Sequence, residues 1–133
     1  MNNIVDTVVK IGKFKILIQT LRETDLIETL SLDGPYTILA PTDEAFNKLP
    51  KQFLEDILKN KEQLTELLTH HIIQKKVMAN SFNKISTIST SNGKKLSVDS
   101  RDTLQIDDGR IIEKDIICLN GIIHIIDCVL IPK

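Results

Sequence analysis

The sequence predicts an α+β fold with a helical N-terminal half and a C-terminal half made mainly of β-sheet. Apolar residues recur at intervals of three and four through residues 4–21 and again through residues 53–68, which is the spacing of amphipathic helices. After Val77, β-branched residues dominate and turn-forming pairs punctuate the chain, at Asn92-Gly93, Asp108-Gly109 and Asn120-Gly121. A chain of 133 residues is long enough for one hydrophobic core, and we expect a single domain over residues 1–133.

Capping and breaking residues predict where the helices begin and end. Gly12 is expected to divide the first apolar stripe into two helices. Asp25 and Glu28, three residues apart, predict a capping box for a short third helix. Thr42 is expected to cap the helix that follows a strand over residues 36–40, and Asn60 to separate two later helices.

Residues 122–131 form a nearly unbroken apolar run, which is typical of a strand buried on both faces. We expect this strand to lie against the strand that begins at Tyr36. With Asn120 and Gly121 as a two-residue hairpin turn, Cys118 would pair with Ile123. Cys128 would then lie about 17 Å from Cys118 along the ladder, so both thiols are expected to be free.

Composition and charge argue against several classes of protein. The formal net charge is -1, with 17 Lys and Arg against 18 Asp and Glu, so no overall field attracts nucleic acid. No apolar run approaches the roughly 20 residues of a transmembrane helix. The first residues lack the pattern of an export signal, and two free thiols suit a reducing cytoplasm.

Three stretches resemble the signature segments of the fasciclin family, in order and in spacing. They are ETLSLDGPYTILAPTDEAF at residues 28–46, LLTHHIIQKKV at residues 67–77 and NGIIHIIDCVLIP at residues 120–132. The resemblance covers essentially the whole chain. It implies helices packed along one side of a wedge of two small β-sheets, and a role in adhesion or ligand binding. Members of this family usually work outside the cell or at its surface, whereas the first residues here lack the pattern of an export signal, so localisation stays open.

The resemblance also implies candidate interaction residues. EKDII at residues 113–117 resembles a short Asp-Ile segment that supports integrin contact in some animal members, which makes Asp115 and Ile116 the main candidates. Lys114 stands where one version of that segment has proline. His70 and His71 stand at the family's Tyr-His pair and are secondary candidates, since His70 replaces the tyrosine.

The histidines and carboxylates suggest no catalytic or metal centre. His70 and His71 are neighbours on an expected strand and would point to opposite faces, so structural, hydrogen-bonded roles are favoured for His71 and His124. His124 and Asp127 are an odd number of residues apart on the expected strand, which also separates them. We therefore expect no enzyme, cofactor or metal site.

Two hypotheses of binding remain, and the oligomeric state stays open. The first is a module that binds a protein partner or cell-surface component. The alternative is a carrier of an apolar small molecule, such as a lipid or carotenoid, in a groove between helices and sheet. Charged turns are interpreted as solvated surface rather than as anion or calcium sites; they include Lys75, Lys76, Lys94, Lys95, Asp99, Asp102, Asp107 and Asp108.

Overall fold

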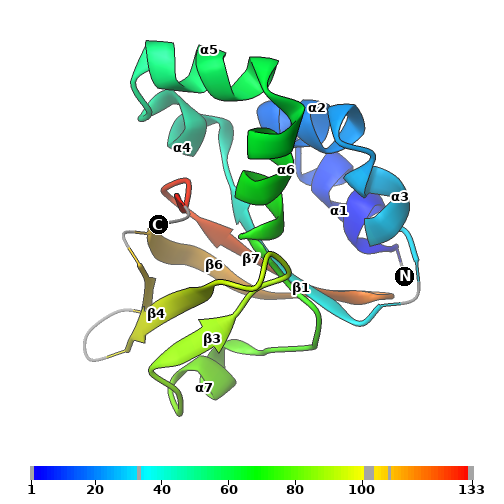
Figure 1. Cartoon of the computed structure of the whole chain (residues 1–133). Coiled ribbons are helices and arrows are strands. Elements are labelled where there is room, and N and C mark those ends of the chain that lie inside the picture. Colours follow the sequence, from blue (N-terminus) through cyan, green and yellow to red (C-terminus); the bar gives the residue numbers. More distant parts are fainter. Residues whose placement is uncertain (1, 33, 101–103, 108, 132–133) are drawn as a thin grey trace.

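Helices lie along one side of a curved sheet in the computed structural model, which describes residues 2–32, 34–100, 104–107 and 109–131 (Figure 1). The helices of this layer are α1 (Ile4–Ile11), α2 (Lys15–Glu23), α3 (Leu26–Leu30), α4 (Asp43–Asn47), α5 (Lys51–Lys59) and α6 (Lys61–Thr69). A short helix, α7 (Ala79–Phe82), lies on the other side of the sheet. The predicted α+β class is confirmed.

The sheet has seven strands in the order β2-β1-β7-β6-β5-β4-β3. The strands are β1 (Tyr36–Pro41), β2 (Ile72–Ile73), β3 (Thr87–Ser89), β4 (Lys95–Asp99), β5 (Gln105–Ile106), β6 (Gly109–Cys118) and β7 (Gly121–Ile126). β1 and β7 pair in parallel, whereas every other pair is antiparallel. The half with β2, β1, β7 and β6 and the half with β5, β4 and β3 are joined at β5–β6 and form a wedge (Figure 1).

Three of the four predicted helix boundaries are confirmed. Gly12 ends α1 with a left-handed backbone (φ 79°), a conformation that glycine adopts without steric cost. The side chains of Thr42 and Asn60 cap α4 and α6 by accepting hydrogen bonds from N–H groups in the first turn. The capping box at Asp25 was wrong. Asp25 itself has a left-handed backbone (φ 61°), and its carboxylate lies 3.4 Å from Lys61 Nζ instead of capping α3.

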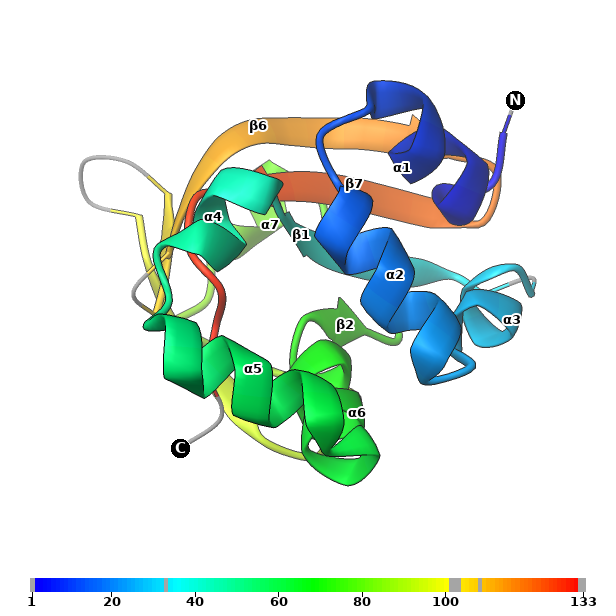
Figure 2. The ribbon, with the colours of Figure 1, turned by 90° about the horizontal axis from the view of Figure 1, so that it is seen from above.

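β7 is buried on both faces, as predicted, and separates two hydrophobic clusters. Ile123 and Ile125 belong to a helix-side cluster, whose largest fully buried side chains include Phe14, Phe46, Leu17, Leu30 and Leu67. Ile126 belongs to a wedge cluster, with Leu39, Ile73, Phe82, Ile88, Leu96 and Ile106. Figure 2 looks from the helical side onto β1 and β7, which run side by side beneath that layer. β7 therefore contributes to both cores at once.

The predicted hairpin register was wrong by two residues. Leu119 and Asn120 form the turn between β6 and β7, and Cys118 pairs with Gly121. The reason is the buried Asn120 side chain, which accepts a hydrogen bond from the Ile4 N–H (2.9 Å) and donates to the carbonyls of Leu30 and Leu32 (2.7 Å each). These bonds to α1 and to the end of α3 hold Asn120 in the turn. Cys118 and Cys128 are not joined by a disulfide, in agreement with the prediction.

His71 fastens α6 to the end of the chain. The ring is 2% exposed, and its Nδ1–H donates to the Leu67 carbonyl (2.8 Å). Its Nε2 accepts a hydrogen bond from the Leu130 N–H (2.9 Å), which requires an unprotonated Nε2. Burial lowers the pKa of His71 to about 4, against the opposing effect of the Leu67 bond, and His70 lowers it further. His71 is therefore neutral in the folded chain.

We expect Gly121→Ala to destabilise the fold more than Gly93→Ala. A Cβ at Gly121 would collide with the carbonyl oxygen of Tyr36 and lie 2.7 Å from Ile4 Cδ1, so the paired backbones of β1 and β7 must separate. The expected loss in free energy of unfolding is about 3 kcal/mol or more, measured by urea denaturation. Gly93 has open space around it, and only its left-handed backbone (φ 84°) makes alanine cost about 1 kcal/mol. Equal losses would contradict the close approach of the two strands.

His71 should also make stability depend on pH. Because the pKa of His71 falls from 6.5 to about 4 on folding, the unfolded chain takes up a proton below pH 6.5 that the folded ring does not. The free energy of unfolding should fall between pH 6.5 and pH 4 by about 1.4 kcal/mol per pH unit from this group, and no further below pH 4. His71→Gln removes the titrating ring, so urea unfolding at several pH values should show a shallower slope. An unchanged slope would exclude this role.

Candidate functional site

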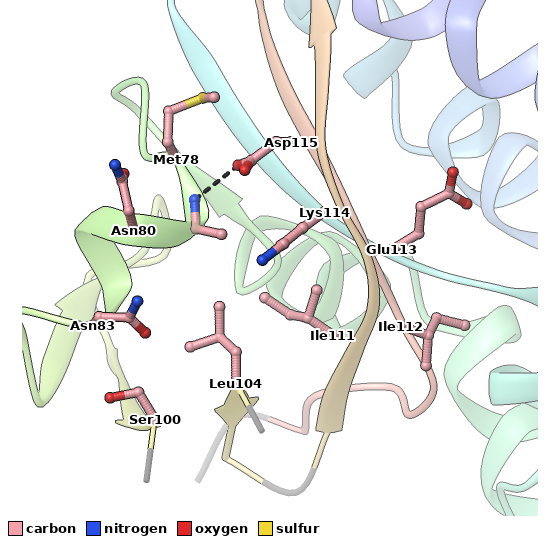
Figure 3. A pocket seen from close by; sticks show the side chains of 11 residues that line it. Met78, Asn80, Asn83, Ser100, Leu104, Ile111, Ile112, Glu113, Lys114 and Asp115 are labelled. Carbon is pink, nitrogen blue, oxygen red and sulfur yellow. Dashed lines mark hydrogen bonds between the residues drawn. The ribbon is translucent and has the colours of Figure 1, made fainter. Parts of the chain in front are cut away.

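Asp115, the main candidate from the sequence, lies at an irregular point of β6. The pairing of β6 with β7 shifts register between Ile111 and Glu113 and again between Glu113 and Ile116. Asp115 has a left-handed backbone (φ 58°), which aspartate and asparagine adopt more readily than most other non-glycine residues. These shifts, which we call the β6 bulge, interrupt the strand's alternation, and the Asp115 side chain points toward α7 (Figure 3).

The Asp115 residue is held at two places. Its Oδ1 accepts a hydrogen bond from the Ala79 N–H at the start of α7 (2.8 Å; Figure 3). Its own backbone N–H donates to His124 Nδ1 (3.1 Å). The side chain is still 31% exposed. The carboxylate is thus partly open to solvent, while both of these bonds limit its freedom to move.

His124 is the buried support of the β6 bulge. The ring is fully buried in β7, and because Nδ1 accepts from Asp115, the proton lies on Nε2 and is donated to the Val77 carbonyl (2.7 Å). Phe82 of α7 packs against the ring, with centroids 5.5 Å apart. Burial lowers the pKa of His124, against the opposing effects of Val77 and Asp115. The predicted structural, hydrogen-bonded role of His124 is confirmed.

Asp127, the acidic residue closest to His124 along the sequence, does not contact that histidine. Its Oδ1 accepts a hydrogen bond from the backbone N–H of Arg110 (2.8 Å). The carboxylate beside His124 is instead that of Asp115, with Oδ1 4.0 Å from Nδ1. Sequence spacing did not reveal this neighbour because the contact depends on how β6 pairs with β7 around the bulge.

A pocket of about 640 Å³ lies between α7 and β6, with Asp115 at its edge. Figure 3 shows Lys114, Ile111 and Leu104 directed into it, whereas Glu113 points the other way from the strand. The pocket wall facing Lys114 carries polar side chains, among them Asn80 of α7 and Asn83, which directly follows α7. The lining of the pocket therefore combines apolar and polar side chains.

Ile116 is half-buried and packs against the helix-side cluster. The exposed apolar side chains of this strand are instead Ile112 and Ile117, with exposed fractions of 56% and 53%. Sequence reasoning did not single out these two residues, since a regular alternation along an apolar strand does not tell which isoleucines face solvent once a bulge shifts the phase.

His70 and His71 lie in the turn that ends α6, so the expected placement on a strand was wrong. Both are 2% exposed. His70 Nδ1 lies 3.1 Å from Asn92 Nδ2 and 3.4 Å from Thr90 Oγ1, whereas His71 contacts Leu67 and Leu130. The two rings thus connect α6 to different parts of the chain.

The described residues include no group of three or more histidine, cysteine or acidic side chains arranged to hold a metal ion. Of the acidic turn residues, Asp107 accepts a hydrogen bond from the Ser97 N–H (2.7 Å), and Asp102 and Asp108 lie outside the described residues. Over the same described ranges, no helix has the length and apolar character needed to cross a bilayer.

Comparisons with known proteins agree with this architecture. The model of the Fasciclin domain matches residues 12–132. The chain is 33% identical over 131 residues to the uncharacterized protein sll1735 of Synechocystis, with 98% of both chains covered. It is also 35% identical over 111 residues to human periostin, covering 82% of this chain and 13% of periostin.

A solved structure shows the same fold. It is a FAS1 domain pair from the insect cell adhesion molecule Fasciclin I, with a TM-score of 0.70 and 24% sequence identity. The match covers 91% of this chain and 46% of the solved one. With the family match over residues 12–132 and the shared arrangement of helices and sheet, the chain belongs to the fasciclin family.

Proposed function

We propose that this chain is a non-enzymatic binding module that contacts a protein partner or cell-surface component through the surface around Asp115. The observation that carries the proposal is the β6 bulge. There the partly exposed carboxylate of Asp115 accepts a hydrogen bond from Ala79, and the backbone N–H of Asp115 donates to buried His124. A group that is already ordered loses little conformational entropy on binding. Asp115 is therefore suited to recognise a basic side chain of a partner.

The surroundings of Asp115 supply the other parts of a contact surface. A carboxylate offers about four acceptor positions, of which the Ala79 N–H occupies one. Ile117, which is more than half exposed on the same strand, provides apolar area, whereas Ile112 points the other way, as Glu113 does (Figure 3). An apolar surface with a fixed charge beside it is a common composition for a protein interface.

The hydrogen bonds of the two buried histidines, His71 and His124, favour a binding role for the chain over a catalytic one. Each nitrogen of His71 and of His124 is bonded to a backbone group. A general acid or base needs a nitrogen within reach of a substrate proton, and both rings have theirs in use. The fold neighbour, described as a cell adhesion molecule, favours binding as well.

The secondary candidates and the carrier hypothesis are less well supported. His70 and His71 are 2% exposed, so we propose that they act by holding the fold and not by touching a partner. A carrier groove between helices and sheet would have to form where Phe14, Phe46 and Leu67 are packed together, each with at most 1% exposure. A ligand there would separate the helices from the sheet, so we favour a protein partner.

We expect Asp115→Asn to reduce binding of the fluorescently labelled protein to cells of the species that produces it by about tenfold, measured by flow cytometry. Asparagine tolerates the left-handed backbone and still accepts from Ala79, so only the charge is lost. Glu113→Gln removes the same charge from the same strand, but Glu113 points the other way (Figure 3), and this variant should bind like the unmodified protein.

Equal binding by Asp115→Asn and the unmodified protein would exclude the Asp115 surface, and absence of binding by the unmodified protein would exclude adhesion. A lipid or pigment extracted from protein purified from its own host would favour the carrier instead.

A further inference from the structure

An open groove of about 460 Å³ lies between the two ends of the sheet. One wall is the end of β2 with the residues that follow it, and the other wall is β3. Past β3, the Ser91 N–H donates to the Ile72 carbonyl (2.8 Å), which joins the two ends of the sheet beside the groove. Ile73, Ile85 and Ile88 supply apolar lining. We call this the β2–β3 groove.

The β2–β3 groove lies in the most basic part of the chain. Residues 67–98 contain five lysines and no aspartate or glutamate, although the whole chain has a net charge of -1. The structure brings one lysine of each pair, Lys75 and Lys95, to the lining of the same groove. Within the described part of the chain neither has an ion-pair partner, whereas Lys94 pairs with Glu66 (2.9 Å). Two lysines far apart in sequence thus make one positive surface.

Among the residues that the structure describes, β3 has backbone groups without a partner, and they face this groove. It is the last strand of the sheet, and its bonds to β4 run through alternate residues: the Val98 N–H donates to Ser86, and the Thr90 N–H donates to Lys94. In an antiparallel ladder the residues between these direct their N–H and C=O groups the other way. Those residues are Thr87 and Ser89, and both line the groove.

We propose that the β2–β3 groove binds an extended acidic segment of a partner protein, which adds to the free edge of β3 as a strand while Lys75 and Lys95 pair with its carboxylates. Backbone bonds to Thr87 and Ser89 provide the pairing, and the lysines provide the preference for acidic sequence. Lysines beside an edge strand repel a second copy of the same edge, which disfavours self-association here. This groove and the Asp115 surface lie on different strands, so the site goes beyond the function proposed above.

The test uses a seven-residue peptide with acetylated and amidated ends, in which Glu alternates with Thr and Val. We expect titration of the ¹⁵N-labelled full chain to shift the amide signals of Thr87 and Ser89. Binding should weaken as salt rises from about 0.05 M to about 0.5 M. A peptide of the same sequence that is N-methylated at alternate residues keeps its charge but loses backbone donors. It should bind about tenfold more weakly.

Charge reversal separates this groove from the rest of the surface. Lys75→Glu with Lys95→Glu should reduce peptide binding about tenfold or more. Lys10→Glu with Lys51→Glu makes the same change in net charge on exposed positions of α1 and α5, and should leave binding close to that of the unmodified chain. Asp115→Asn should also leave peptide binding intact, which distinguishes this site from the proposed adhesive surface.

Three results would overturn strand addition. Equal binding of the N-methylated peptide and the unmodified peptide would mean that charge attraction alone holds the peptide. Shifts that avoid Thr87 and Ser89 would place the peptide elsewhere. Binding of heparin or of anionic phospholipid vesicles, without binding of the peptide, would assign the basic surface to a polysaccharide or a membrane.

Discussion

The parallel pairing of β1 with β7 is the constraint on which the rest of the structure depends. It brings together the strand that ends before α4 and the strand near the end of the chain. Gly121 allows the two backbones to approach at Tyr36, and Asn120 in the preceding turn bonds to α1 and to the end of α3. The helical layer and the sheet are therefore tied at one corner, and both hydrophobic clusters form on either side of β7.

Two buried histidines connect segments that the sheet does not join. His71 links α6 to Leu130, and His124 links the β6 bulge to Val77 before α7. Each ring donates through one nitrogen and accepts through the other, which only the neutral form of imidazole can do. Burial favours that neutral form, so the environment that makes these bonds strong also keeps the rings uncharged.

Both surfaces proposed for binding occur where the regular ladder is interrupted or ends. At the β6 bulge, the irregular backbone directs the Asp115 side chain toward α7. At β3, the sheet simply stops, and alternate backbone groups face a basic groove. Regular pairing elsewhere uses the backbone donors and acceptors internally. Irregular and terminal strand segments are thus the parts of this sheet that retain groups for a partner.

The sequence by itself determined the α+β class, the helix boundaries at Gly12, Thr42 and Asn60, and the strand buried on both faces, because these depend on local backbone preference and on periodicity. Only the tertiary structure decided the hairpin register, the bulge that turns Asp115 toward α7, and the meeting of Lys75 with Lys95. Each of these arises from contacts between segments distant in sequence: Asn120 had to reach α1 and Leu30, and the β2–β3 groove needed the sheet to curve. The energy of strand pairing and side-chain contacts between distant segments determined these three features, and no local sequence pattern reports that energy.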